Sequence, residues 1–204
     1  MAQTSTTLLG SYDHKKNIGV ATDISFSQTG TEYKISATST VLAGAAALAV
    51  RDLITVTGST SNNSTFTVKS VATDGLSIIV EEVITTEAAG DSVTIDHVGC
   101  VTDKIKGDGY YSQVDGVHTV AYRVLNRADS TEDFNGTIIM QGTLASTPSE
   151  DDWFNITSTL LTSDQSTTIA SYNFTGNFVY IRAKVTCTNA STNRAMITSI
   201  LLNS

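Results

Sequence analysis

Three groups of neighbouring acidic residues are the first candidates for chemistry. They are Glu81-Glu82, Glu132-Asp133 and Glu150-Asp151-Asp152. Two carboxylates on facing strands can hydrolyse a glycosidic bond, one as general acid and the other as base or nucleophile. Neighbours within one turn do not establish such a pair, and the sequence has no Asp-x-Asp-x-Asp-Gly calcium pattern. We therefore interpret these residues as solvated turn charges and expect no metal site.

Four aromatic residues could form a surface that binds carbohydrate, because aromatic rings pack against the apolar faces of sugars. Trp153 and Phe154 follow the last acidic turn, and Tyr110 and Tyr111 follow a Gly-Asp-Gly tripeptide. A purely structural role is the favoured interpretation for these aromatic residues. The single Trp can anchor a core, and the two tyrosines can pack at a sheet edge after a tight turn.

The usual catalytic signatures are missing from the sequence. It contains no Gly-x-Ser-x-Gly elbow, no His-Glu-x-x-His and no Walker loop. His14, His97 and His118 are too far apart in sequence to form a pair of metal ligands. We expect His118 to be packed or surface-polar within a strand, and we predict a protein that is not an enzyme and binds no cofactor.

The two cysteines, Cys100 and Cys187, lack the spacing of metal ligands and the density of a disulfide scaffold. Isolated thiols most often serve as small apolar core groups. The sequence leaves open whether these two form a disulfide.

Composition narrows the class of protein further. Lys and Arg number 12 against 20 Asp and Glu, which gives a net charge of −8, and only 16% of the 204 residues are charged. An acidic chain without a basic stripe is poorly suited to nucleic acid, whose phosphates require Lys and Arg. No apolar run approaches the length of about 20 residues that a membrane helix needs. We expect neither a nucleic-acid nor a membrane partner, in a chain of one large or two small domains.

The apolar pattern predicts an all-β chain. Residues 1–22 have little periodicity and indicate an N-terminal arm that becomes ordered against a partner surface. Residues 23–98 indicate a small barrel-like β module, with strands at 53–57, 64–71, 76–80 and 92–96 separated by turns. The Ala-rich stretch 41–51 contains Gly44, so a loop or a single helical turn is expected there.

Residues 99–204 indicate an antiparallel β-sandwich of jelly-roll or Ig-like type. Strands are predicted at 117–125, 136–144, 178–187 and 196–202, enough for two sheets packed face to face. Alternation in the third of these strands places five residues on one face: Val179, Ile181, Ala183, Val185 and Cys187.

Several segments resemble known virion proteins. They are residues 107–111, 115–120, 142–148, 152–154 and 173–183 in the second half, and residues 52–59, 62–68 and 87–90 in the first. The second-half segments look like the β-sandwich of structural proteins from contractile-tailed bacteriophages, especially those infecting marine cyanobacteria. The first-half segments are similar to a small β module scattered through phage structural proteins. That module usually has Gly after the Asn pair where this chain has Ser64, which leaves the turn type there open.

The resemblance implies a fold and a virion location, and no catalytic residues come with it. A capsid decoration or accessory protein on the particle exterior is the first expectation. The alternative is a tail, neck or fibre component that binds host surface carbohydrate. The implied partners are other virion proteins, the major capsid protein first and tail proteins otherwise. A homo-oligomer is also implied, with a trimer expected because decoration proteins often occupy threefold positions.

Overall fold

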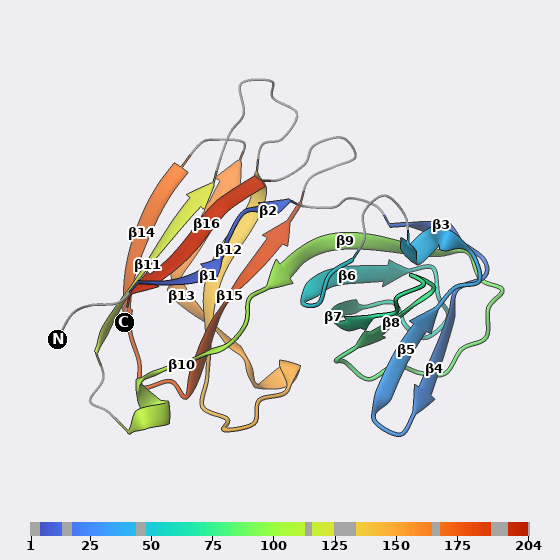
Figure 1. Ribbon diagram of the computed structural model, residues 1–204, viewed down its shortest axis with the longest axis horizontal. Coiled ribbons are helices and arrows are strands. Elements are labelled where there is room, and N and C mark those ends of the chain that lie inside the picture. The colour runs from blue at the N-terminus through green and yellow to red at the C-terminus, as the bar shows by residue number, and fades with distance from the viewer. Residues whose placement is uncertain are drawn as a thin grey trace. The chain divides into compact units, whose positions relative to one another are not determined.

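Figure 1 shows the computed structural model of the chain. It describes residues 5–13, 18–43, 48–112, 116–124, 134–164, 168–188 and 196–203. The described elements are antiparallel strands and short 3-10 helices, which confirms the predicted all-β fold. The chain divides into two compact units, residues 1–14 with 101–204 (the sandwich unit) and residues 15–100 (the small unit).

The small unit is built on one antiparallel sheet, with its described strands in the order β3-β9-β6-β7-β8-β5-β4. Between β5 and β6 lies the 3-10 helix η1 (Thr40–Ala43), the single helical turn expected within 41–51. The strands are β3 (Gly19–Ala21), β4 (Ser25–Thr29), β5 (Glu32–Ser36), β6 (Asp52–Thr57), β7 (Thr65–Val71), β8 (Ser77–Val80) and β9 (Val93–Val101).

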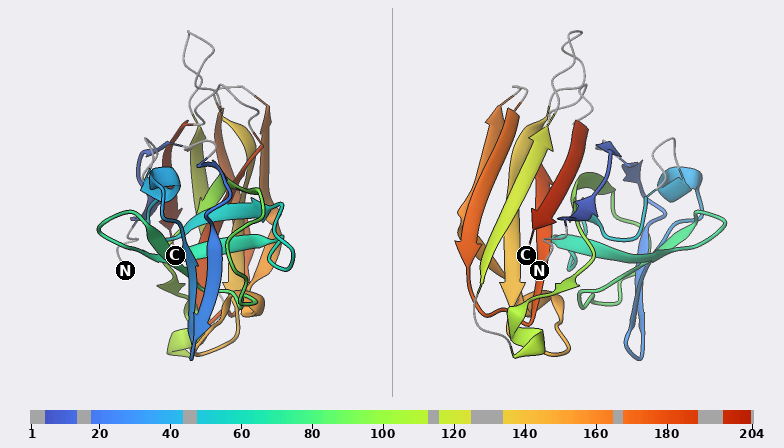
Figure 2. Two further views of the ribbon diagram at one scale, coloured as in Figure 1. Left: turned by 90° about the vertical axis from the view of Figure 1, so that its right-hand side faces the viewer. Right: turned by 60° about the vertical axis from the view of Figure 1, so that its left-hand side comes forward.

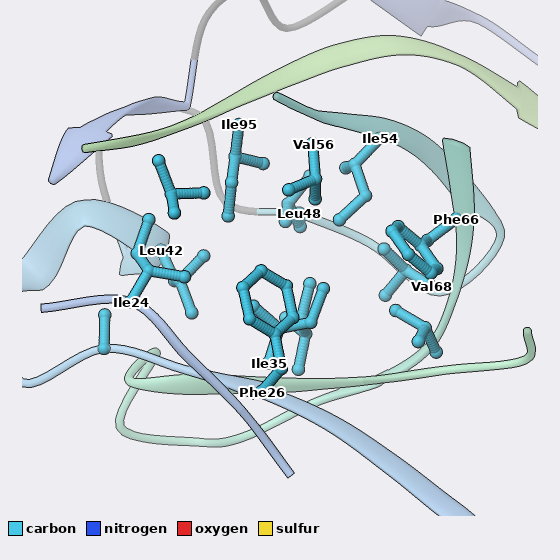
Figure 3. Close-up of a cluster of buried hydrophobic side chains, with 14 of the residues drawn as sticks. Ile24, Phe26, Ile35, Leu42, Leu48, Ile54, Val56, Phe66, Val68 and Ile95 are labelled. Carbon is cyan, nitrogen blue, oxygen red and sulfur yellow. The ribbon is translucent and has the colours of Figure 1, made fainter. Parts of the chain in front are cut away.

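One apolar core lies within this sheet, and Figure 3 shows side chains from several strands pointing into it. Phe26, Ile35, Ile54 and Ile95 are each at most 1% exposed. The sheet curls around the core without closing, because β3 and β4 at its two ends are not paired with each other in the described pairings. The barrel-like module is therefore an open one.

β6 and β7 form the hairpin predicted across the Asn- and Ser-rich turn at 58–64. The carboxylate of Glu87 accepts hydrogen bonds from the backbone N–H groups of Thr60 (2.9 Å) and Ser61 (3.0 Å). It also accepts one from Asn62 Nδ2 (3.0 Å), and Asn62 Oδ1 accepts one from Thr85 N–H (2.8 Å). Side-chain hydrogen bonds therefore fix the shape of this long turn.

The sandwich unit contains two antiparallel sheets packed face to face (Figure 2). One has the order β1-β16-β11-β14, with β2 also paired to β16, and the other contains β13-β12-β15 with β10 paired to β15. Two 3-10 helices, η2 (Asp108–Tyr111) and η3 (Glu150–Asp152), lie in its connections. The strands are β1 (Ser5–Leu9), β2 (Tyr12–Asp13), β10 (Ile105–Lys106), β11 (Val117–Val124), β12 (Asn135–Thr143), β13 (Phe154–Asp164), β14 (Thr168–Thr175), β15 (Tyr180–Cys187) and β16 (Met196–Asn203).

Alternating residues of these strands form the sandwich core. Ile181, Ala183, Val185 and Cys187 of β15 are buried, as the alternation predicts, whereas Val179 lies before the strand and is half-buried. Buried residues of β11, among them Tyr122 at 0% exposure, supply apolar groups from the other sheet. Both cysteines are buried and neither is in a disulfide, so the bridge left open by the sequence is not formed.

Strand pairing corrects the N-terminal arm expected over residues 1–22. β1 pairs with β16, with Thr6 opposite Leu202, and β2 pairs with the same strand. β3 belongs instead to the small unit, where it pairs with β9. Backbone hydrogen bonds hold these short strands and do not depend on side-chain periodicity, so the pattern did not reveal them. The boundary between the units lies at residues 100–101, two residues beyond the predicted position.

Candidate functional site

The candidate site is built on the face of β15 that points away from the sandwich core. Tyr180 and Arg182 alternate along this strand with the buried residues Ile181 and Ala183, so they share the outward face. β10 runs antiparallel to β15 and places Lys106 directly opposite Tyr180.

Five side chains around this pair form what we call the tyrosine–lysine cluster: Lys104, Lys106, Tyr110, Tyr111 and Tyr180. Lys106 Nζ lies 4.0 Å from the ring centroid of Tyr110 and 5.7 Å from that of Tyr111. Lys104 Nζ lies 4.7 Å from the ring centroid of Tyr180. The Tyr110 ring contacts both other rings, with centroid distances of 5.1 Å to Tyr111 and 5.5 Å to Tyr180. These distances are typical of cation–π and tilted aromatic contacts.

Much of the tyrosine–lysine cluster is open to solvent. Tyr111 is 57% exposed and Tyr110 42%, both lysines are exposed, and Tyr180 is half-buried. A hydrogen bond with the Tyr110 side chain raises the pKa of Lys106 and outweighs the opposing effect of desolvation. The ammonium group therefore stays charged at neutral pH, beside rings that could each still contact another molecule.

The backbone of η2 holds its two tyrosines in place. Gly107 N–H donates to Val179 O (3.0 Å), and Gly109 N–H donates to Phe178 O (2.8 Å). A Cβ atom on Gly107 would lie 2.5 Å from the Phe178 carbonyl oxygen, and one on Gly109 would lie 2.6 Å from that of Asn177. Only glycine permits so close a backbone approach, which accounts for the Gly-Asp-Gly tripeptide before the tyrosines.

Trp153 belongs to a neighbouring cluster organised by Arg182. The guanidinium carbon of Arg182 lies 4.2 Å from the Trp153 ring centroid. Arg182 donates to both carboxylate oxygens of Glu150 (2.9 and 2.6 Å) and, through Nε, to Gln141 Oε1 (2.9 Å). Trp153 is half-buried, so it is not a central core anchor, and its contact with Arg182 covers part of the ring.

Phe154 lies in a different aromatic group from Trp153. Its ring centroid is 5.8 Å from that of Phe178, which in turn is 6.3 Å from that of Phe174. Of the four aromatic residues proposed from the sequence to bind carbohydrate, the structure places Tyr110 and Tyr111 in direct contact. Trp153 and Phe154 take part in separate contacts.

Each unit contains a buried histidine beside an aspartate. His118 Nε2 lies 3.3 Å from Asp108 Oδ2, and the imidazole stacks on Phe174 at 5.0 Å. Neither ring nitrogen of His118 has a hydrogen-bond partner among the described residues. His97 Nε2 lies 3.3 Å from Asp52 Oδ1 in the small unit. His118 is thus packed within its strand, and His14 lies outside the described residues.

The acidic groups singled out in the sequence have individual partners. Glu81 pairs with Lys69 at 3.3 Å, and Glu82 accepts hydrogen bonds from the backbone and side chain of Thr67. Asp152 accepts hydrogen bonds from the side chain and the backbone N–H of Ser149. Residues 132–133 lie outside the described part of the chain. Within that part, no group of three or more His, Cys, Asp or Glu side chains is placed to hold a metal ion.

Four members of these clusters were not predicted from the sequence as site residues: Lys104, Lys106, Tyr180 and Arg182. The signal for two of them was present, because the alternation that buries Ile181 places Tyr180 and Arg182 outward. The sequence could not predict that Lys104 and Lys106 lie beside Tyr180. This contact depends on the pairing of β10 with β15, a strand some 75 residues later.

Comparisons with protein-family models, with curated proteins and with solved structures found no match to this chain. In the described ranges, no helix has the length and apolar character needed to cross a membrane. The candidate site therefore rests on its own geometry.

Proposed function

We propose that the chain is a non-enzymatic structural protein of a tailed-bacteriophage virion that decorates the exterior of the capsid. The resemblance of its two parts to phage structural proteins motivates the proposal. The structural observation that carries it is a pair of long sheet edges with almost no charge, because such edges suit a protein that assembles with other chains.

These edges are β13 and β14, the end strands of the two sheets of the sandwich unit. In the described pairings, β13 pairs only with β12 and β14 only with β11. β13 has 11 residues, of which only Asp164 is charged, and β14 has 8 residues, none of them charged. Leu160 on β13 is 45% exposed, and Ile169 on β14 is 70% exposed.

Exposed sheet edges normally carry Lys, Pro or a bulge that discourages pairing with another chain. β13 has a bulge opposite residues 138–140 but contains no Lys or Pro. Copies arranged around a symmetry axis would bury such edges without bringing like charges together. This feature supports a homo-oligomer, for which the resemblance suggests a trimer. The proposed partner on the particle is the major capsid protein.

The edge contact is tested by measuring the molar mass of the purified chain by light scattering. The unmodified chain should form a closed oligomer, and the double variant Leu160→Lys with Ile169→Lys should shift it to monomer. Val83→Lys is the matched control, since Val83 is 71% exposed in the small unit. A monomeric unmodified chain, or an oligomer that survives both edge substitutions, would contradict the role of these edges.

The location is tested on purified phage particles. Mass spectrometry should detect the chain, and a cryo-EM reconstruction should show its density over the head lattice in a copy number related to capsid symmetry. Particles without the chain would overturn the virion proposal. Density at the tail, neck or fibres would instead support the second candidate function.

That second function is a tail, neck or fibre component that binds host surface carbohydrate. The observation that favours it is the tyrosine–lysine cluster, in which exposed aromatic rings lie on an anchored turn. Binding of a purified host glycan that is lost in Tyr111→Ala would support it.

A further inference from the structure

We infer that the tyrosine–lysine cluster binds an acidic carbohydrate, whose sugar rings pack on the tyrosines and whose carboxylate or sulfate groups pair with Lys104 and Lys106. This inference rests on the second candidate function and specifies the class of its ligand.

The aromatic part of the cluster suits a ligand with several sugar rings. Tyr110 and Tyr111 meet edge to face, with an interplanar angle of 76°, and Tyr110 is tilted by 54° to Tyr180. The three rings are therefore not coplanar. Lys106 lies over one face of Tyr110 and Lys104 over one face of Tyr180, so Tyr111, the most exposed of the three, offers the most open ring surface. The apolar C–H faces of a pyranose pack well on aromatic rings, and the phenol hydroxyls can hydrogen-bond to sugar hydroxyls.

The two ammonium groups set the charge of the ligand. They lie over the same rings, at 4.0 Å from Tyr110 for Lys106 and 4.7 Å from Tyr180 for Lys104. The nearby carboxylate of Asp108 is directed toward the Gly116 N–H (2.8 Å) and His118 (3.3 Å). An anionic group on the bound sugar would therefore meet two positive charges at the edge of the aromatic surface.

The charge of the whole chain argues for a sugar over a nucleic acid. A net charge of −8 repels a polyanion with dense phosphates. An acidic polysaccharide carries its charges more sparsely and gains much of its contact from uncharged ring faces. Two lysines beside three tyrosines suit a ligand with few charges and much uncharged ring surface.

The site is preformed, which lowers the entropic cost of binding. Two backbone hydrogen bonds and the close approach of Gly107 and Gly109 fix η2 against residues 177–179. The pairing of Lys106 with Tyr180 fixes β10 on β15. No rearrangement of the backbone is required before a ligand can contact the rings.

The test is titration calorimetry of the full chain with three probes at low and physiological salt. Oligogalacturonate supplies one carboxylate per sugar, a κ-carrageenan oligosaccharide supplies one sulfate per disaccharide, and maltoheptaose is a neutral comparison. At least one acidic probe should bind about tenfold or more tightly than the neutral probe, and binding should weaken with added salt. The probe that binds identifies the anionic group.

Four variants locate the binding. Tyr111→Ala and Lys106→Gln should each weaken the acidic probe by about tenfold. Phe154→Ala removes an exposed aromatic ring elsewhere, Lys69→Gln removes an exposed lysine charge in the small unit, and both should bind as the unmodified chain does. Circular dichroism confirms that each variant is folded. Binding that Tyr111→Ala leaves unchanged is non-specific charge attraction and overturns the inference.

The remaining outcomes distinguish a failure of the acidic-ligand inference from a failure of carbohydrate binding itself. Equal binding of neutral and acidic probes, lost in Tyr111→Ala, would overturn the acidic ligand and leave carbohydrate binding in place. No binding of these probes or of host glycans would overturn both.

Discussion

Arg182 on β15 and Glu150 on η3 form a two-fold hydrogen-bonded ion pair, with Nη1–Oε1 and Nη2–Oε2 distances of 2.9 and 2.6 Å. The Arg182 side chain is only 4% exposed, whereas that of Glu150 is 21% exposed. A nearly buried guanidinium needs such a partner, because an unpaired charge in this position is strongly unfavourable. The pair therefore fixes η3, and with it Trp153, over the outward face of the sheet.

We predict that Glu150→Ala lowers the free energy of unfolding of the sandwich unit by about 3 kcal/mol, because it leaves the Arg182 charge without its carboxylate. Urea denaturation followed by Trp153 fluorescence measures the change. Asp151→Ala is the matched control, since Asp151 is an exposed acidic residue in the same short helix. Equal stability of the two variants would show that the ion pair contributes little.

The carboxylate of Asp152 should titrate below its ordinary range. Hydrogen bonds from the side chain and then the backbone of Ser149 lower its pKa from the usual 3.8. A lowered folded-state pKa gives a stabilisation that is present above pH of about 4 and is lost as the pH falls through the folded-state value. We predict that Ser149→Ala moves the Asp152 titration upward and reduces this acid-side stabilisation.

NMR titration of the side-chain carboxyl carbons measures this shift. Asp23 provides an internal control, because hydrogen bonds from Thr38 and Ser39 lower its pKa independently of Ser149. The Asp23 titration should be the same in both proteins. An unchanged Asp152 titration in Ser149→Ala would refute the assigned cause.

Most strands with regular alternation could be predicted from the sequence. β11, β12, β15 and β16 begin and end within two residues of their predicted ranges. β13 was missed, because Ser and Thr fill both its inward and outward positions and weaken the contrast between the two faces. β14 was missed although Ala170, Tyr172 and Phe174 alternate with the more polar Ser171, Asn173 and Thr175. β1 was missed as well, because the sequence of Ser5–Leu9 does not alternate between apolar and polar residues.

In the candidate site, a contact between neighbours in the sequence could be predicted, but contacts between distant strands could not. The adjacent residues Tyr110 and Tyr111 were predicted as a possible surface, and they do lie together. Trp153 and Phe154 are adjacent as well, yet they contact Arg182 and Phe178 respectively. The register of β12, β13 and β15 decides which partner each of these two rings contacts. A single sequence does not reveal the register between distant strands.

Glu87 should be a stabilising residue of the small unit despite its position in a connection between strands. Its carboxylate accepts hydrogen bonds from Thr60, Ser61 and Asn62. Glu87→Gln replaces one acceptor oxygen by a donor and removes the charge, so we expect a loss of about 1–3 kcal/mol. Urea denaturation followed by circular dichroism tests this.

Glu81→Gln is the comparison for Glu87→Gln. It breaks the exposed pair with Lys69, in which the two side chains are 36% and 54% exposed. An exposed pair contributes about 0–1 kcal/mol. If Glu81→Gln costs as much as Glu87→Gln, the hydrogen bonds to the 58–64 turn are not the source of the stabilisation.

The close backbone contact at Gly109 should be essential for the arrangement of the tyrosine–lysine cluster. Its N–H donates to Phe178 O, and an added Cβ would meet the Asn177 carbonyl oxygen at 2.6 Å. Backbone lies on both sides of this contact and cannot yield as a side chain can, so Gly109→Ala should cost about 1–3 kcal/mol. Hydrogen exchange should show faster exchange at the residue-109 amide, and NMR should show loss of contacts between the Tyr110 and Tyr180 rings. Gly10→Ala is the control, because an added Cβ there meets no atom within 4 Å, and it should leave both measurements unchanged. If the Tyr110–Tyr180 contacts persist in Gly109→Ala, the cluster is held by its side chains and not by the anchored backbone of η2.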